Sequence, residues 1–258
     1  MMEINAHAKV NIFLKITGYK DGYHTILSRF MLVESLYDTI RFVPAECERF
    51  TIEGTPEVPR ESNTIYKAWV ALNEATGDLD LLEFFHHHKV VVQKRIPSQA
   101  GLGGGSSDAG AFLRLAVEAC RVPISLDDLA SVGAKVGADV PFFVYGYPSA
   151  NVSGFGEVVE PFDEAPLDLE IFTPPVACDT ARVYRRFREE FFHQIDPLSF
   201  QGWHLEPSAT LLERIADPAL LNDLYPAALL ECPRLGEYAR PGWFFSGSGS
   251  SFFRPRNS

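Results

Sequence analysis

The sequence predicts an α+β fold, and three observations support this class. Apolar and polar residues alternate over residues 4–16, as in a strand with one buried face. A β-branched run over 89–96 is followed by glycines and then by apolar residues at helical spacing, which predicts a strand, a loop and a helix. A turn-rich stretch over 146–156 predicts a boundary that divides the 258 residues into domains over 1–147 and 148–258.

The first predicted strand carries its polar residues on one face. These residues are Asn5, His7, Lys9 and Asn11. Such a face suits either solvent or the wall of a cleft, and the usual exposure of polar side chains favours solvent. Next, Asp21-Gly22 predicts a hairpin turn that leads into strands over 25–33 and 37–43.

Helix signals follow in the middle of the chain. Ser62-Asn63 and Gly77 predict the start and the end of a helix over 64–76. Ser125 begins a capping box for a helix that ends before Gly137. The helix after the glycine loop has three candidate caps, which are Ser106, Ser107 and Asp108.

Asp139 lies between the helix that ends before Gly137 and the apolar run 140–144, which we expect to be a strand. A carboxylate at a helix exit beside an apolar strand is electrostatically unusual. It is an N-cap, an ion-pair partner or a site residue, and the residues alone rank these three interpretations equally.

The second half of the chain mixes strand and helix patterns. It contains a predicted strand over 167–172, a helix that begins near Asp179, and helices over 208–215 and 218–230. A second glycine-rich turn, Ser246-Gly-Ser-Gly249, lies between two apolar pairs.

The loop from Pro97 to Gly110 predicts a phosphate-binding site. Four glycines, Gly101, Gly103, Gly104 and Gly105, stand between a predicted strand and a predicted helix. Backbone without Cβ atoms can approach an anion closely, and a helix N-terminus adds unpaired N–H groups and partial positive charge. The alternative is a tight turn without a ligand. The loop is neither a Walker A sequence nor a dinucleotide fingerprint.

Composition limits the class of partner and the compartment. The chain has 23 basic and 34 acidic residues, a net charge of -11, which argues against nucleic acid and against an anionic membrane. The four cysteines form no C-x-x-C pair, which is typical of reduced thiols. No apolar run reaches membrane-spanning length and the first residues do not resemble a signal peptide, so we expect a cytoplasmic protein.

Several segments, in order along the chain, resemble the motifs of the GHMP kinases. They are Ala8-Lys-Val-Asn11, Asp21-Gly-Tyr-His24, Asn63-Thr-Ile-Tyr-Lys-Ala68, the loop Pro97 to Gly110, Gly137-Ala-Asp-Val-Pro-Phe-Phe143, Asn222-Asp-Leu-Tyr-Pro226 and Ser246-Gly-Ser-Gly249. The resemblance implies a two-domain GHMP fold with the active site in the cleft between an ATP-binding domain and a substrate-binding domain. It also implies ATP as the phosphoryl donor, with Mg²⁺.

The resemblance assigns roles to individual residues. Asp139 is implied as general base and Lys9 as the catalytic cation beside it. The implied ATP-binding residues are Asn63, Pro97, Gly101, Leu102, Gly103, Gly104, Gly105, Ser106 and Ser107, and no residue is assigned to a metal. The implied substrate-binding residues are Asn11, Tyr23, His24, Thr180 and Tyr184, with Tyr23, His24 and Tyr184 around a cytosine base.

The acceptor implied by Asp21-Gly-Tyr-His24 is the tertiary hydroxyl of a CDP-linked methylerythritol, in non-mevalonate isoprenoid precursor synthesis. The alternatives are a homoserine or mevalonate kinase, whose substrates carry no base, and a nucleotide sensor without catalysis. The expected state is a monomer or a homodimer. Two departures from the family pattern are Ser98-Gln-Ala100 at the loop entry and Gly110, which replaces a helical alanine at a cost of roughly 0.5–1 kcal/mol.

Overall fold

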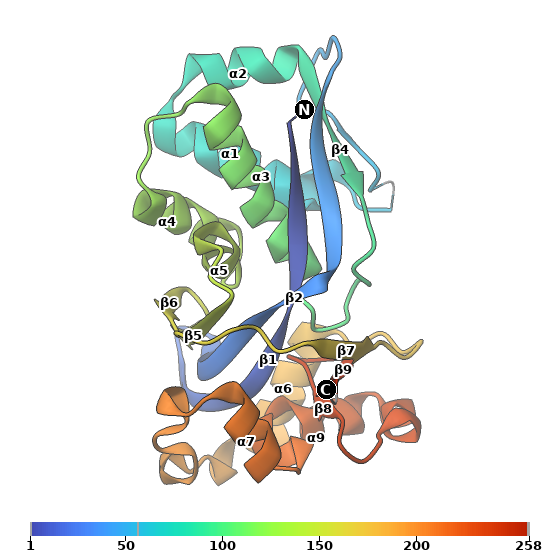
Figure 1. Ribbon diagram of the computed structural model, residues 1–258. Coiled ribbons are helices and arrows are strands. Elements are labelled where there is room, and N and C mark those ends of the chain that lie inside the picture. Colours follow the sequence, from blue (N-terminus) through green and yellow to red (C-terminus); the bar gives the residue numbers. More distant parts are fainter. Residues whose placement is uncertain (1, 56, 257–258) are drawn as a thin grey trace. The chain divides into compact units, whose positions relative to one another are not determined.

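The computed structural model describes residues 2–55 and 57–256, and the chain divides into two compact units (Figure 1). Unit 1 comprises Met1–Ala8, Glu34–Ile96 and Gly103–Gly146, and unit 2 comprises Lys9–Val33, Pro97–Leu102 and Tyr147–Ser258. Both units contain helices and strands, so the α+β class is confirmed.

Unit 1 packs helices against a sheet. Its strands are the first part of β1 (Glu3–Lys20), the second part of β2 (Tyr23–Pro44), β3 (Ile52–Glu53) and β4 (His88–Gln93). β2 and β4 are antiparallel, with Thr39 opposite Gln93, and β3 is parallel to β4. The helices are η1 (Arg60–Ser62), α1 (Thr64–Thr76), α2 (Leu79–His86), α3 (Gly104–Cys120), α4 (Leu126–Val136) and α5 (Val140–Tyr145).

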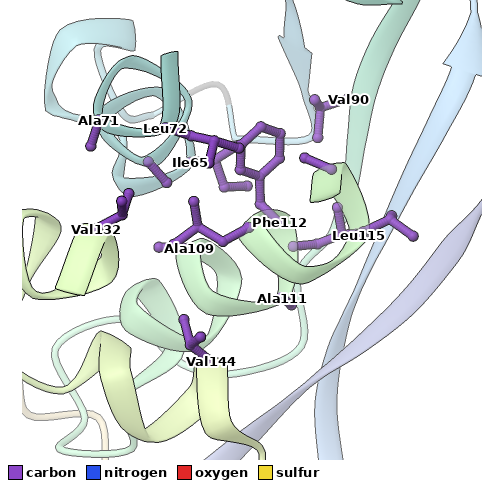
Figure 2. Close-up of a cluster of buried hydrophobic side chains, with 14 of the residues drawn as sticks. Ile65, Ala71, Leu72, Val90, Ala109, Ala111, Phe112, Leu115, Val132 and Val144 are labelled. Carbon is purple, nitrogen blue, oxygen red and sulfur yellow. The ribbon is translucent and has the colours of Figure 1, made fainter. Parts of the chain in front are cut away.

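The core of unit 1 is centred on α3 (Figure 2). Phe112 of this helix is fully buried and points toward Ile65 and Leu72 of α1 and toward Val90 of β4. Burial of a phenylalanine contributes about 1.5–3 kcal/mol. The core therefore fixes α3, and with it Gly104 and Gly105 in the first turn of this helix.

Unit 2 contains the remaining strands and helices. In one sheet, β2 pairs with β5 (Ser149–Gly154), with Ile26 opposite Gly154, and β5 pairs with β6 (Val158–Pro161). A second sheet has the order β7 (Leu169–Phe172), β9 (Phe252–Pro255), β8 (Phe244–Phe245). The helices are α6 (Thr180–Glu190), η2 (Phe192–Gln194), η3 (Pro197–Phe200), η4 (Trp203–Leu205), α7 (Ser208–Arg214), α8 (Pro218–Leu221), α9 (Leu224–Glu231) and η5 (Pro233–Tyr238).

Strand β1 is buried more completely than its alternation predicts. Every residue from Ala8 to Ile16 is buried, and this includes Lys9 at 4% exposure and Asn11 at 1%. The interpretation of this polar face as solvent-facing is therefore wrong at these two positions. Polar side chains that lose water need protein partners, which are described below.

Two apolar segments differ from their predicted elements. β2 is one strand through residues 34–36, where the sequence predicted a break. Residues 140–145 form the short helix α5 and not a strand, with Val140 to Val144 all buried. A short apolar run that is buried on all sides carries no period that separates strand from helix.

Helix termini were predicted well, except at the start of α3 and in the helix predicted over 218–230. Asn63 caps α1 by accepting from the Ile65 N–H, Gly77 is left-handed at its end, and Ser125 caps α4. The predicted serine and aspartate caps of α3 are wrong, because α3 begins at Gly104 and its N-cap is Gly103 with φ 71°. In addition, the predicted helix over 218–230 is interrupted at residues 222–223, between α8 and α9.

Gly110 is explained by the packing of α3 against α5. A Cβ atom at this position would lie 2.6 Å from Phe143 Cβ and 3.2 Å from the Val144 backbone nitrogen. The backbone of α5 therefore occupies the space that an alanine side chain would need. The low helix propensity of glycine is offset here by the close approach of two helices.

We expect Gly110→Ala to lower the free energy of unfolding by about 1–3 kcal/mol, because overpacking outweighs the gain in helix propensity. Chemical denaturation measures this change. Gly105→Ala in the same helix is the control, since its Cβ would meet only Thr64 at 3.5 Å. A stabilised Gly110→Ala variant would contradict the packing explanation.

Candidate active site

The N-terminus of α3, in unit 1, presents backbone N–H groups of the kind that bind anions. Gly103 takes a left-handed φ of 71°, and α3 follows directly with Gly104 and Gly105 in its first turn. The first N–H groups of an α-helix have no partner within the helix and carry partial positive charge. At Gly104 a Cβ would lie 2.9 Å from the Ile96 side chain, so glycine lets the strand end and the helix start approach closely.

The two loop serines have different environments. Ser107 is buried and its hydroxyl donates to the His7 carbonyl at 2.7 Å. Ser106 is half-buried, and its Oγ lies 3.8 Å from the position that a Cβ of Gly137 would occupy. Ser106 is thus the loop hydroxyl that faces the segment leading to Asp139.

Lys94 is a cation next to the start of α3 that the sequence motifs did not indicate. Its Nζ bonds to Asp38 and, at 2.6 Å, to Asp108, and it lies 3.7 Å from the Cβ position of Gly104. Burial raises the pKa of Asp108 to about 7, although Lys94 opposes the rise. A lysine near a strand end resembles a solvated residue in sequence, so no local signal indicates this cluster.

Asp139 lies in unit 1, at the residue before α5. It is half-buried and occupies the N-cap position, but its side chain makes no capping hydrogen bond. The N-cap interpretation is therefore wrong in its chemistry, because the carboxylate does not accept a hydrogen bond from the first N–H groups of α5. Gly137, two residues earlier, places this segment beside Ser106.

Lys9 lies in unit 2 and is held by polar partners inside the sheet. Its Nζ donates to Asn11 Oδ1 at 2.7 Å and lies 4.2 Å from the centre of the Phe30 ring. The Asn11 side-chain nitrogen donates to Ser28 Oγ at 2.9 Å. The Lys9 backbone N–H donates to the Leu102 carbonyl at 3.0 Å, so β1 is tied directly to the entry of the glycine loop.

The turn from Ser246 to Gly249 packs against Asn11 of β1 and Gly101 of the glycine loop, all in unit 2. Ser246 Oγ donates to the Gly101 carbonyl at 2.9 Å, and the Asn11 N–H donates to Ser246 Oγ at 3.4 Å. Gly101 has a φ of 72°, and a Cβ there would lie 2.1 Å from the Ser246 carbonyl oxygen. Three motifs that are far apart in sequence therefore meet here: Ala8 to Asn11, the entry of the glycine loop, and the turn from Ser246 to Gly249.

Asn222 holds this turn from the other side. Its Nδ2 donates to the carbonyls of Phe245 at 3.0 Å and Gly247 at 2.9 Å. Its Oδ1 accepts from the Leu224 N–H at 2.9 Å. The break between α8 and α9 that the helical pattern did not predict thus supplies a brace for the glycine-rich turn.

An aromatic cluster surrounds His24 in unit 2. The imidazole lies 5.2 Å from the Tyr184 ring centre, 5.0 Å from Tyr19 and 6.0 Å from Phe187. Its Nε2 is buried without a hydrogen-bond partner in the described structure. Burial, followed by the charge of Arg188, lowers the pKa of His24, so the imidazole is neutral at neutral pH.

The remaining predicted substrate residues are placed differently. Tyr23 is 69% exposed and its ring contacts Phe155, at 5.9 Å between centres, and not the cluster around His24. Thr180 shares a hydrogen bond of 2.8 Å with Ser248 of the glycine-rich turn. The structure thus brings His24 and Tyr184 together and directs Thr180 to the turn.

The predicted ATP residues outside the glycines have mixed environments. Asn63 is 5% exposed, and its Nδ2 donates to Thr55 Oγ1 at 3.0 Å. The neighbouring Thr64 hydroxyl donates to the Gly105 carbonyl at 2.6 Å, which ties α1 to the loop. Leu102 is buried and Pro97 is exposed. The roles of these residues in ATP binding stay predictions.

Membrane spans and metal clusters are both absent from the described residues. Across residues 2–55 and 57–256, no helix has the combined length and apolar character needed to cross a bilayer. The same part of the chain contains no group of three or more His, Cys, Asp or Glu residues arranged to hold a metal ion.

Comparison with known proteins identifies the family. Residues 63–147 match the model of the GHMP kinases N terminal domain. A protein of Sulfurovum sp. (strain NBC37-1) named 4-diphosphocytidyl-2-C-methyl-D-erythritol kinase is 61% identical over 257 residues, 100% of both chains. One of the same name from Sulfurimonas denitrificans is 48% identical over 96% of this chain and 95% of its own.

Solved structures agree with this assignment. A crystal structure of 4-(cytidine 5'-diphospho)-2C-methyl-D-erythritol kinase has a TM-score of 0.77 and 30% identity, covering 99% of this chain and 90% of its own. A homoserine kinase from Cytophaga hutchinsonii, at 17% identity and a TM-score of 0.67, covers 99% of this chain and 85% of its own and shares the fold alone. The chain therefore belongs to the family of the 4-diphosphocytidyl-2-C-methyl-D-erythritol kinases, within the GHMP kinases.

Proposed function

We propose that this chain transfers the γ-phosphoryl group of ATP to the tertiary hydroxyl of 4-diphosphocytidyl-2-C-methyl-D-erythritol, a step in non-mevalonate isoprenoid precursor biosynthesis. The observation that carries the proposal is 61% identity to a protein of that name, over 100% of both chains. The chain is accordingly an ATP-dependent small-molecule kinase.

The geometry at the start of α3 supports ATP as the donor. Phosphoryl transfer depends mainly on positioning and on stabilisation of negative charge. The free N–H groups around Gly104 and Gly105 and the positive end of a 17-residue helix supply both for a phosphate. We assign Pro97, the segment from Gly101 to Ser107, and Asn63 to ATP.

Asp139 and Lys9 are the proposed catalytic residues. Asp139 would accept the proton of the attacking hydroxyl. Lys9, held by Asn11, would orient the nucleophile and offset the charge that develops on it. The proposal requires both side chains to act on one hydroxyl, although Lys9 belongs to unit 2 and Asp139 to unit 1.

Mg²⁺ is part of the proposal because kinases use it to neutralise phosphate charge. The ion is held mostly by phosphate oxygens and water, with one or two protein ligands, so a site needs no cluster of carboxylates. Ser106 is the loop hydroxyl proposed for such an ion, since it is half-buried whereas Ser107 is buried.

The environment of His24 supports a cytosine-containing acceptor over homoserine or mevalonate. A neutral imidazole has one donor and one acceptor nitrogen, and its buried Nε2 has no partner in the described structure. Tyr184 offers an aromatic face beside it, and Tyr23 an exposed one. We assign Tyr23, His24, Tyr184 and Thr180 to substrate, with Asn11 near the reacting hydroxyl.

Three further parts of the proposal concern organisation. Residues 1–147 would form the ATP-binding domain, which also carries Asn11, Tyr23 and His24, and residues 148–258 would form the substrate-binding domain, with Thr180 and Tyr184. The protein would work in the cytoplasm as a monomer or a homodimer. A nucleotide sensor without catalysis is disfavoured, because binding alone does not need a buried lysine with fixed partners.

The direct test is ATP consumption by the purified protein with three acceptors: the CDP-linked methylerythritol, mevalonate and homoserine. We expect turnover with the first alone. Turnover only with mevalonate or homoserine, or with none of the three, would exclude the proposed reaction.

Asp139→Asn should reduce single-turnover phosphorylation by about 10²–10⁴-fold, because the amide cannot accept the hydroxyl proton. ATP affinity measured by calorimetry should stay within a few fold. Asp127→Asn is the matched control in unit 1, where Asp127 accepts a hydrogen bond from the Tyr145 hydroxyl. Near-normal turnover of Asp139→Asn would remove the assigned base.

Tyr184→Ala should raise the KM for the CDP-linked substrate about tenfold or more, since stacking on one base is worth about 1–3 kcal/mol. The KM for ATP should change less than about twofold. Tyr238→Ala, which removes a ring packed on Phe172, controls for general loosening of unit 2. Equal effects on both substrates would contradict the stacking assignment.

Acidification should weaken binding of the CDP-linked substrate through His24. The pKa of His24 is lowered from its usual value of 6.5, so the ring is neutral at pH 7 and becomes protonated only at lower pH. We expect the KM for this substrate to rise as the pH falls below about 6.5. His24→Gln should lose this pH dependence, and an unchanged profile in that variant would exclude His24 as its source.

A further inference from the structure

We propose that Ser28 is a positioning residue of the kinase, because it fixes the orientation of the Asn11 amide that holds Lys9. Ser28 lies in β2 and is fully buried. Its hydroxyl oxygen lies 2.9 Å from the side-chain nitrogen of Asn11, a residue that the family motifs identify. The inference rests on the catalytic role proposed above for Lys9.

The order of the hydrogen bonds determines which way each group points. Ser28 Oγ lies 2.5 Å from the Phe13 carbonyl oxygen, which can only accept. The single hydroxyl proton of Ser28 is therefore used for that carbonyl. Toward Asn11 the serine oxygen can only accept, so it selects the NH₂ group of the amide.

This selection decides what Lys9 meets. With the NH₂ group directed to Ser28, the carbonyl oxygen of the amide faces the ammonium, at 2.7 Å from Nζ. The flipped amide would place NH₂ against the ammonium, which has three donors and no acceptor capacity. The Phe13 carbonyl thus sets Ser28, Ser28 sets Asn11, and Asn11 sets Lys9.

A purely structural role for Ser28 makes a different prediction. In this alternative, the only role of the buried serine is to donate a hydrogen bond to a strand carbonyl, and the bond to Phe13 is sufficient for it. In that case loss of the hydroxyl would lower stability but leave the Asn11 amide and the chemistry of Lys9 unchanged. The two roles therefore separate in the kinetic constants.

The test compares Ser28→Ala with the wild type in the proposed reaction. We expect kcat to fall about tenfold or more, because Asn11 loses the acceptor that fixes its amide. The KM values for ATP and for the CDP-linked substrate should change less than about threefold. A kcat within about twofold of the wild type would overturn the proposal.

Two variants separate positioning from general damage. Ser149→Ala removes another fully buried serine hydroxyl of unit 2, one that donates to Glu164 at 2.7 Å, and should leave kcat unchanged. A comparable loss of kcat in Ser149→Ala would overturn the proposal. Ser28→Thr keeps the hydroxyl and should restore kcat to within about threefold, even where its extra methyl lowers stability. A folded Ser28→Thr as impaired as Ser28→Ala would also overturn it.

A double-mutant cycle tests whether Ser28 acts through Asn11. In the Asn11→Ala background, Ser28→Ala should add less than about a twofold loss of kcat, since the group it orients is already absent. Additive losses would show that Ser28 acts by another route.

One readout does not depend on the reaction. The side-chain amide resonances of Asn11, assigned by their loss in Asn11→Ala, should shift or broaden in Ser28→Ala and stay unchanged in Ser149→Ala. This holds even if the wild type does not phosphorylate the CDP-linked substrate, in which case the proposed reaction fails by itself. Unchanged Asn11 resonances in Ser28→Ala would overturn the positioning role.

Discussion

A buried ammonium in the middle of strand β1 constrains much of unit 2. An amine removed from water is strongly unfavourable unless other groups replace the lost hydration. At Lys9 these groups include the Asn11 amide and the face of Phe30. Asn11 in turn needs Ser28, and its backbone N–H meets the hydroxyl of Ser246. One buried charge thus links two neighbouring strands with a turn more than 200 residues away in sequence.

Glycine allows the backbone around this charge to come close. Gly101 and the Ser246 carbonyl approach so tightly that no side chain fits between them. Asn222 then satisfies the carbonyls of Phe245 and Gly247, which the tight turn directs inward. Buried backbone carbonyls require such partners, so the asparagine between α8 and α9 serves the turn rather than a helix. Loop, turn and strand therefore depend on one another.

Much of the fold could be predicted from local chemistry. Asn63, Gly77 and Ser125 act through their own backbone neighbourhoods, so their sequence signals correspond directly to caps in the structure. The short helix α5 and the continuity of β2 depend on burial from several sides, which no local pattern records. The same limit explains the error over the polar face of β1, because alternation shows that two faces differ but not what covers each face.

The residues of the candidate site likewise fall into those that local sequence identifies and those that only the folded structure identifies. Glycines, Lys9, Asn11 and Asp139 stand in motifs that resemble a known family, so the sequence alone is enough to name them. Ser28, Lys94 and Asp38 could not be named in this way, because their meaning lies in hydrogen bonds to partners that are distant in sequence. Tyr23 and His24 are adjacent in sequence, but the Tyr23 ring is exposed and contacts Phe155, outside the cluster around His24. Only the folded chain shows this difference.

The path of the chain through the two units has a consequence for dissecting the protein. Residues 9–33 and 97–102 belong to unit 2 together with everything from Tyr147 onward. A fragment that starts near residue 148 would lack the part of β2 that pairs with β5 from Ile26 to Met31. It would expose an unpaired strand edge, and its glycine-rich turn would lose the hydrogen bonds of Ser246 to Asn11 and Gly101. Cutting the gene at one point would therefore yield two incomplete modules, and mixing them would be complementation rather than the docking of finished domains.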